Sequence, residues 1–218
     1  MYIIAVVNTK GGVGKTTIAS ALAVRAAKDS PRVAMVDLDP QRSLVEWWDR
    51  RGAVDNPTVF EGAASPANAV EALALDGWDW VFLDGPPALL LCMEQALSVA
   101  TFAIVPARAS LVDLMATTDV LAMAEAAGVP HLMVLNAVPS SGKSGDQARA
   151  MLIRQKTPVA ETIVHQRQSY VAGLNAGKSA AEVNAGRDKA AASEIDALWS
   201  EVKAATIAAA KKKARRRR

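Results

Sequence analysis

The stretch that decides the fold lies near the amino terminus and reads Asn8-Thr9-Lys10-Gly11-Gly12-Val13-Gly14-Lys15-Thr16-Thr17. It follows an apolar run, Tyr2–Val7, and precedes a segment that favours a helix, Thr17–Lys28. A glycine-rich loop between a strand and a helix is the setting of a phosphate-binding loop. Glycines let backbone N–H groups approach phosphate oxygens, and the start of the helix adds a partial positive charge. The sequence therefore predicts a site for ATP in this loop.

The side chains of this loop have separate expected roles. Lys15 can reach the β- and γ-phosphates, and the hydroxyl of Thr16 can join the coordination shell of Mg²⁺. The residues expected to bind the nucleotide are Lys10, Gly11, Gly12, Val13, Gly14, Lys15, Thr16 and Thr17. The alternative is a glycine-rich turn that binds no ligand, and Gly-Lys-Thr at the start of the helix disfavours it.

Away from this loop, short β-branched runs alternate with helical segments. The expected strands are Tyr2–Val7, Val33–Asp37, Trp80–Leu83, Phe102–Val105 and His131–Leu135. The expected helices are Thr17–Lys28, Ser43–Arg51, Pro66–Leu75, Leu111–Ala127, Gly145–Arg154 and Arg187–Ala210. Near-continuous apolar strands separated by helices indicate an α/β fold, with a mostly parallel, doubly wound sheet and helices on both faces. We expect one ATPase domain over residues 1–210 and a basic, disordered tail over residues 211–218.

Two further motifs place carboxylates at the ends of expected strands. Val36–Gln41 contains Asp37 and Asp39, and Val81–Pro87 contains Asp84 after an apolar strand. The carboxyl ends of the strands in such a sheet face the ligand crevice. Asp84 is therefore expected to hold Mg²⁺ through water.

The loop departs from the usual phosphate-binding pattern, because Thr9 stands where the first glycine is expected and Lys10 precedes two glycines. This is the deviant Walker A motif, and it resembles the family of ParA partition ATPases, MinD, nitrogenase iron protein and arsenite-pump ATPases. The resemblance implies that Lys10 reaches across a dimer interface to the partner's nucleotide. The alternative is an ordinary surface lysine on a mobile loop.

The same resemblance assigns roles to other residues. It makes Lys10, Lys15 and Asp39 catalytic, with Asp39 orienting the attacking water. Asp37 would support a Mg²⁺ site shared with Thr16 and Asp84. Asn136, after the strand His131–Leu135, stands where the family places an asparagine near adenine, although an ordinary turn asparagine is an equal alternative. The resemblance covers residues 2–205 and implies the P-loop NTPase fold.

The composition restricts which branch of this family the chain can belong to. Cys92 is the single cysteine, so the chain lacks the thiolates of a cluster carrier or an arsenite pump. Thr206–Ala210 has little apolar area to bury, so we expect no stable membrane insertion, unlike MinD. The loop begins within ten residues of Met1, which leaves no room for a helix-turn-helix extension. The short, ParF-like ParA proteins fit best, and no targeting segment is visible, so we expect a cytoplasmic, nucleoid-associated protein.

Charge is concentrated at one end of the chain. The net charge is +3, but residues 211–218 read Lys-Lys-Lys-Ala-Arg-Arg-Arg-Arg, so the rest has more Asp and Glu than Lys and Arg. Such a distribution suggests a polyanionic partner, and we expect nonspecific DNA. Candidate contacts are Arg167, Lys178, Arg187, Lys189 and Lys211–Arg218. The alternative for each of them is a solvated surface charge.

These observations predict an ATPase that forms a sandwich homodimer with ATP and Mg²⁺, binds DNA nonspecifically and moves a plasmid or chromosome locus. A centromere-binding, ParB-like protein would stimulate hydrolysis and release the dimer. One alternative uses the same switch to position a cytoplasmic protein cargo. Others are a MinD-like ATPase at a membrane surface, a metal-cluster carrier or a synthetase-like ATPase.

Overall fold

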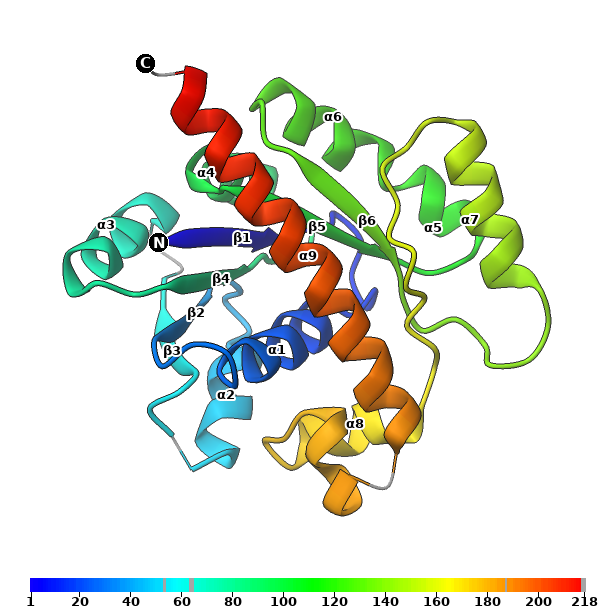
Figure 1. Cartoon of the computed structure of the whole chain (residues 1–218), viewed down its shortest axis with the longest axis horizontal. Coiled ribbons are helices and arrows are strands. Elements are labelled where there is room, and N and C mark those ends of the chain that lie inside the picture. Colours follow the sequence, from blue (N-terminus) through cyan, green and yellow to red (C-terminus); the bar gives the residue numbers. More distant parts are fainter. Residues whose placement is uncertain (53, 63–64, 187, 217–218) are drawn as a thin grey trace.

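The fold is built on one parallel sheet. The computed structural model describes residues 1–52, 54–62, 65–186 and 188–216 (Figure 1). Its strands are β1 (Tyr2–Val6), β2 (Val33–Asp37), β3 (Thr58–Glu61), β4 (Trp80–Asp84), β5 (Phe102–Ala107) and β6 (His131–Leu135). They pair in the order β3-β2-β4-β1-β5-β6, and every pair is parallel. The predicted α/β class and parallel sheet are therefore confirmed.

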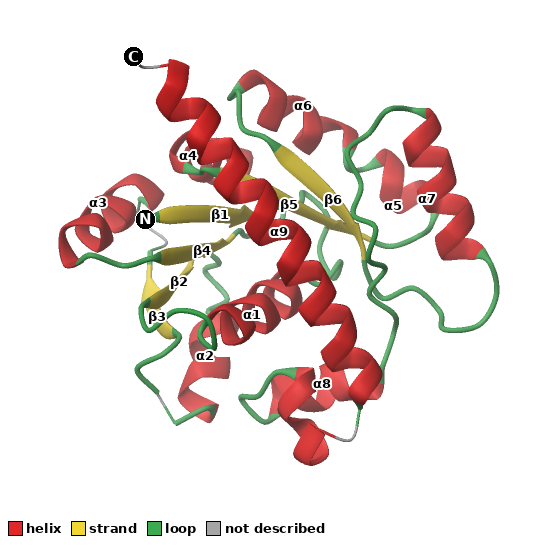
Figure 2. Cartoon of the chain, in the orientation of Figure 1, coloured by secondary structure: helices red, strands yellow, loops and turns green. Residues whose placement is uncertain are grey.

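Helices cover both faces of this sheet, as Figure 2 shows. They are α1 (Lys15–Ala26), α2 (Ser43–Arg50), α3 (Pro66–Asp76), α4 (Leu90–Val99), α5 (Leu111–Met115), α6 (Thr118–Ala126), α7 (Ser144–Arg154), α8 (Gln168–Asn175), the 3₁₀ helix η1 (Ala180–Gly186) and α9 (Lys189–Arg216). Along β1, Ile4 and Val6 join a core formed with α1, α2 and α9. The alternate residue Ala5 joins a core with α4 and α6. Burial on both faces explains why the strand is apolar throughout.

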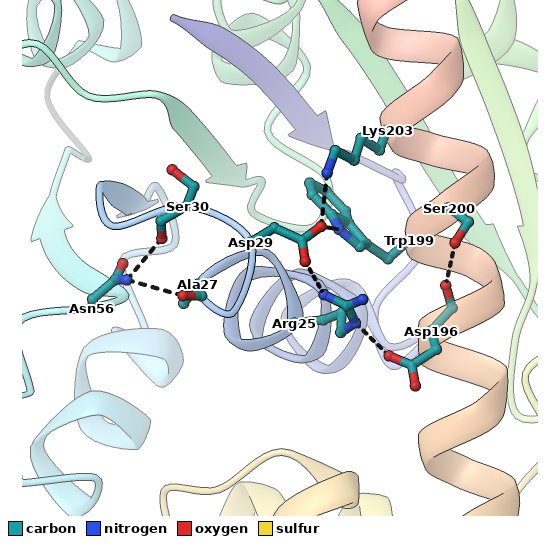
Figure 3. Close-up of polar contacts among 9 residues, drawn as sticks. All are labelled: Arg25, Ala27, Asp29, Ser30, Asn56, Asp196, Trp199, Ser200 and Lys203. Atoms are coloured by element: carbon teal, nitrogen blue, oxygen red, sulfur yellow. Dashed lines mark hydrogen bonds and ion pairs between the residues drawn. The ribbon is translucent and has the colours of Figure 1, made fainter.

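Helix α9 docks across the sheet through the apolar stripe expected from the sequence, whose members Ile195, Leu198, Trp199 and Val202 are all buried. Its polar anchor is Asp29, just beyond the end of α1 (Figure 3). Trp199 Nε1 and Lys203 Nζ donate to one Asp29 oxygen at 2.9 and 2.8 Å, and Arg25 donates to the other at 2.8 Å. Hydrogen bonds from Lys203 and then Arg25 hold the pKa of Asp29 well below its usual range. The anchor fixes α9 against the helix that begins at the nucleotide loop.

The expected single helix Leu111–Ala127 is instead two helices, α5 and α6. The hydroxyl of Thr117, a buried residue, donates to the carbonyl of Leu114 at 2.6 Å. Thr9, in the glycine-rich loop, donates to the carbonyl of Ala116 at 3.2 Å. Side-chain donors therefore satisfy backbone oxygens at the break, and one of them comes from the distant loop.

Four elements had not been expected: β3, α4, α8 and η1. β3 has four residues and lies at the edge of the sheet, so its pattern is short. The start of α4 has exposed leucines at positions 89, 90 and 91, which hide the amphipathic period.

The disordered tail predicted from residue 211 was wrong for residues 211–216, because they continue α9 as helix. Positive charge at a helix C-terminus interacts favourably with the helix dipole, which supports this continuation. Residues 217–218 lie outside the described part. In the part of the chain that is described, no helix combines the length and apolar character needed to cross a bilayer.

Candidate nucleotide site

The carboxyl edge of the sheet gathers the residues that the motifs singled out. The glycine-rich loop follows β1, Asp37 ends β2, Asp84 ends β4 and Asn136 follows β6. Asp37 and Asp84 are direct partners in the β2–β4 register. Residues up to 128 positions apart thus share one edge, which is where a parallel α/β sheet binds its ligand.

The shape of the loop depends on Gly14. This residue caps α1 with φ 92°, a left-handed conformation that favours glycine. A Cβ here would lie 2.1 Å from Nδ2 of Asn136, so the position has no room for a side chain. That amide donates to the carbonyl of Val13 at 2.8 Å. Asn136 therefore braces the loop, while its expected contact with adenine stays a prediction.

Lys15 lies at the start of α1 with its ammonium turned back into the loop. The side chain is buried, and Nζ donates to the backbone oxygen of Lys10 at 3.2 Å. Burial lowers the pKa of Lys15, whereas the charges of Asp84 and Asp39 oppose that shift. A phosphate group would offer this desolvated cation a stronger partner than one carbonyl.

Thr16 and Asp84 form a pair with the features of a magnesium site. The Thr16 hydroxyl donates to Oδ2 of Asp84 at 2.6 Å, while Oδ1 is buried and has no hydrogen-bond partner. Burial raises the pKa of Asp84 to about 7, and the hydrogen bond from Thr16 opposes this shift. Mg²⁺ in nucleotide sites takes one or two protein oxygens, with water and phosphate completing its shell. The unpartnered oxygen beside a hydroxyl fits that requirement.

The two carboxylates near the end of β2 differ in burial and in the number of their hydrogen-bond partners. Asp37 is buried; its Oδ2 accepts the N–H groups of Leu44 and Val45, and its Oδ1 accepts that of Asp39, all at 3.0 Å. Burial raises the pKa of Asp37 against these hydrogen bonds. Asp39 is half-buried, and its Oδ1 accepts the N–H of Gln41 at 2.9 Å. Asp37 therefore shapes the loop before α2, whereas Asp39 lies at the partly exposed rim of the nucleotide site.

Lys10 points away from the interior of its own loop. Its side chain is 37% exposed, and Nζ lies 2.6 Å from Oδ1 of Asp113 in α5. Burial alone would raise the pKa of Asp113, but the hydrogen bonds from Lys10 and Ser110 lower it. In the single chain the second lysine is thus held by a carboxylate of the same subunit.

A pocket of about 480 Å³ lies past the ends of β5 and β6, and Asp113, the partner of Lys10, is one of its lining residues. Its lining includes Arg108, Ser110, Ala137, Pro139 and Gln166. The volume is in the range of small-ligand sites, and the position is on the side of the loop away from Asp84. It offers space for the nucleoside part of a nucleotide.

Three residues of the site had not been assigned roles from the sequence: Asn8, Arg108 and Asp113. The buried Asn8 amide donates to the carbonyl of Pro106 at 2.7 Å, and its Oδ1 accepts the Lys10 N–H at 2.9 Å. Arg108 donates to the Gly12 carbonyl at 2.8 Å. Asn8 opens the decisive motif and was within reach of sequence reasoning, whereas the other two carry no local signal.

The candidate DNA contacts do not form one group. Arg167 is paired with Glu194, with 2.6 Å between the charged atoms, so it is engaged within the fold. Lys178 and Lys189 are exposed near α8 and the start of α9, whereas Lys211–Lys213 lie at the far end of α9. Arg187, Arg217 and Arg218 lie outside the described residues.

The chain is similar in sequence and in fold to several known proteins. The chain is 30% identical to the maintenance of carboxysome distribution protein A of Halothiobacillus neapolitanus, over 92% of this chain and 96% of that protein. It is 34% identical to the chromosome-partitioning ATPase Soj of Thermus thermophilus, over 56% of this chain and 61% of that protein. Its fold matches the septum site-determining protein MinD of Pyrococcus horikoshii, complexed with Mg-ADP, with a TM-score of 0.70 at 22% identity, over 92% and 95% of the two chains.

A family model covers most of the chain. The CobQ/CobB/MinD/ParA nucleotide binding domain matches residues 4–180, which include the loop, both aspartate motifs and Asn136. This span runs from Ile4 in β1 to Ala180, the first residue of η1, and leaves out α9. The chain therefore belongs to the CobQ/CobB/MinD/ParA family of nucleotide-binding ATPases.

Proposed function

We propose that this protein hydrolyses ATP with Mg²⁺ and uses the cycle between monomer and ATP-bound dimer to position a cargo in the cell. The observation that carries the proposal is the buried, unpartnered oxygen of Asp84 beside the Thr16 hydroxyl, at the end of a loop with two lysines. Thr16 and Asp84 would hold the ion, with Asp37 fixing the neighbouring loop. Bound Mg²⁺ would neutralise charge on the phosphate oxygens.

Each residue of the site has a defined task in this proposal. Lys15 turns from the Lys10 carbonyl to the β- and γ-phosphates. Asp39, half-buried on the rim, orients the attacking water. The glycine-rich backbone from Gly11 to Gly14 cradles phosphate oxygens, and the pocket beside Asn136 receives the nucleoside.

Dimerisation depends on the second lysine. Lys10 leaves Asp113 and contacts the phosphates bound by the partner subunit, so each site is completed by the opposite chain. An ammonium paired with a carboxylate at 2.6 Å exchanges one anionic partner for another, which limits the desolvation cost of the move.

The proposal also specifies the kind of cargo. A protein assembly is favoured over a DNA replicon, because the similarity to the carboxysome distribution protein extends over nearly both full chains. The similarity to Soj covers little more than half of this chain, so segregation of a plasmid or chromosome with a ParB-like partner is the second candidate. In both versions the dimer is anchored on the nucleoid through nonspecific DNA.

Light scattering with ADP, with ATP and with ATP plus DNA tests this proposal, together with an assay of released phosphate. We expect a monomer with ADP, a dimer with ATP and Mg²⁺, and phosphate release that EDTA abolishes. A monomer under all conditions, or phosphate release without Mg²⁺, would contradict it. For the cargo, deletion of the gene should disperse a protein assembly in cells; rapid plasmid loss with normal assemblies would favour the second candidate.

A further inference from the structure

The carboxylate of Asp113 is buried, and its charge is compensated by Lys10. Its Oδ1 lies 2.6 Å from the Lys10 ammonium, and its Oδ2 accepts the hydroxyl of Ser110. Only 9% of the Asp113 side chain is exposed. Among the described residues, Oδ1 has no hydrogen-bond partner beyond this ion pair. Because a buried carboxylate without its cation is strongly destabilising, Asp113 needs a positive charge beside it at every stage of a functional cycle.

Formation of the proposed dimer would take that positive charge away. When Lys10 moves to the phosphates of the partner subunit, the ammonium gains a new anion, but Asp113 loses its cation. Ser110 can offer only a neutral hydroxyl in its place. A buried ion pair can be broken at small cost only if both of its members find new partners. The dimer therefore requires a second cation close to Asp113.

Arg108 lies in the right place to be this second cation. It directly follows β5, on the connection to α5, and lines the same pocket as Ser110 and Asp113. Of the described residues that line this pocket, it is the one with a positively charged side chain. Burial raises the pKa of Asp113, hydrogen bonds lower it, and the charge of Arg108 lowers it further. The guanidinium therefore already interacts with the carboxylate through its charge.

The guanidinium of Arg108 has few contacts that would prevent it from moving. The residue is exposed, and Nη2 donates to the carbonyl of Gly12 at 2.8 Å. In the part of the chain that the structure describes, this is its one hydrogen bond, and it takes part in no ion pair. A guanidinium has five N–H donors and can bind both oxygens of a carboxylate. A buried carboxylate is thus a stronger partner for Arg108 than the neutral carbonyl that it contacts.

We propose that Arg108 replaces Lys10 as the partner of Asp113 when Lys10 moves to the phosphates of the partner subunit, and that this exchange stabilises the dimer. Arg108 is a positioning residue, because it acts through Asp113 and contacts no reacting atom. The exchange also releases the carbonyl of Gly12, so the contact between Arg108 and the glycine-rich loop belongs to the monomer. The inference rests on the proposed function for the event that removes Lys10. Its geometry does not, because any loss of Lys10 calls for the same replacement.

The first experiment removes Lys10 by substitution, so it needs neither nucleotide nor a dimer. Thermal melts at neutral pH compare the wild type with Lys10→Ala, Arg108→Gln and the double variant. Each single substitution should lower the Tm only slightly, because one cation remains for Asp113. The double variant should lose at least about 3 °C more than the sum of the two single losses. The matched control is Arg154→Gln, at an exposed arginine that ends α7, and its loss should simply add to that of Lys10→Ala.

The same substitutions in an Asp113→Asn background show whether the carboxylate causes the excess loss. Without its charge, the effects of Lys10→Ala and Arg108→Gln should be additive. If the double variant does not fold, Asp113→Asn should restore its folding. The inference would be overturned by additive losses with Asp113 present. It would equally be overturned by an excess loss, or a failure to fold, that persists in the Asp113→Asn background.

The second experiment measures ATP-dependent dimerisation by light scattering over a range of protein concentrations. Arg108→Gln should weaken the dimer roughly tenfold when Asp113 is present and less than about twofold in the Asp113→Asn background. Arg108→Lys keeps the positive charge and should restore most of the affinity. An equal loss in both backgrounds would show a general structural role and would refute the exchange. If the wild type forms no dimer with ATP, the proposed function fails, and the thermal melts still decide whether Arg108 reaches Asp113.

Discussion

The charged side chains at the two edges of the sheet differ in burial and in pairing. At the carboxyl edge, Lys15, Asp37 and Asp84 are buried, and most of their polar atoms have fixed partners. At the amino edge, the cations at the end of α9 (Lys211–Lys213 and Arg215) are exposed, and none of them takes part in an ion pair among the described residues. The carboxyl edge therefore suits a ligand of defined shape, whereas the amino edge suits a long polymer of uniform charge. Single substitutions should therefore have large effects at the first edge and small, additive effects at the second.

The largest effect is expected from Lys15→Ala. Removing a desolvated cation that binds phosphate should weaken ATP binding roughly 100-fold or more, because charge-assisted contacts of this kind contribute a few kcal/mol. Isothermal titration calorimetry with ATP and Mg²⁺ measures it. Lys28→Ala, an exposed lysine just after the same helix, is the control and should bind normally. Near-normal affinity in Lys15→Ala would remove the basis for the contrast between the edges.

Asp84→Asn should act on both the ion and the fold. We expect the Mg²⁺-dependent gain in nucleotide affinity to fall roughly tenfold or more, since a neutral amide is a poor ligand for a hard cation. The folded protein holds the Asp84 proton more tightly than the unfolded chain, whose carboxyl pKa is near the model value of 3.8. Its contribution to stability is therefore lost as pH rises from about 4 to about 7.

Asparagine does not ionise, so the nucleotide-free Asp84→Asn protein should have a higher Tm than the wild type at pH 8 and a similar Tm near pH 4. Thermal melts across this range, in EDTA, measure the difference. A constant difference at all pH values would show that Asp84 does not titrate in this window.

Lys10→Ala should have a narrower effect, confined to assembly. Its ammonium contacts Asp113 rather than the interior of its loop, so ATP binding by the monomer should change less than about threefold. ATP-dependent dimerisation and hydrolysis should be lost, as light scattering and phosphate release would report. Asp113→Asn, which frees Lys10 without removing it, should strengthen dimerisation. Normal dimers from Lys10→Ala would place this lysine outside the interface.

The smallest effect is expected from one change at the amino edge, Lys212→Gln. One phosphate contact fewer should lower the salt slope by about 0.9 and the DNA affinity by less than about tenfold. Anisotropy titrations measure both, and ATP hydrolysis should be unchanged. A complete loss of DNA binding from this single substitution would indicate a shaped site rather than a diffuse one, and the contrast between the edges would fail.

Sequence reasoning succeeded where the signal is local. The glycine loop, the apolar strands and the aspartates at strand ends are read from adjacent residues, and the sheet, with these residues at its carboxyl edge, is as expected. It failed where a residue depends on a distant one: the break between α5 and α6 rests partly on Thr9, and the partner of Lys10 is Asp113, 103 positions away. The continuation of α9 was missed because a run of cations indicates disorder when its docked helix is not considered.

The close approach of Gly14 and Asn136 has a mechanical consequence. Asn136 directly follows β6, one of the two outer strands, which is hydrogen-bonded to β5 on one side and to residues 158–164 on the other. Outer strands are ordinarily the first part of a sheet to fray. Here fraying would withdraw the amide that supports Val13 and leave a void beside Gly14. The rigidity of the glycine-rich loop thus depends on β6 staying paired in the sheet. The rates of hydrogen exchange in β6 and in residues 11–14 should therefore rise and fall together.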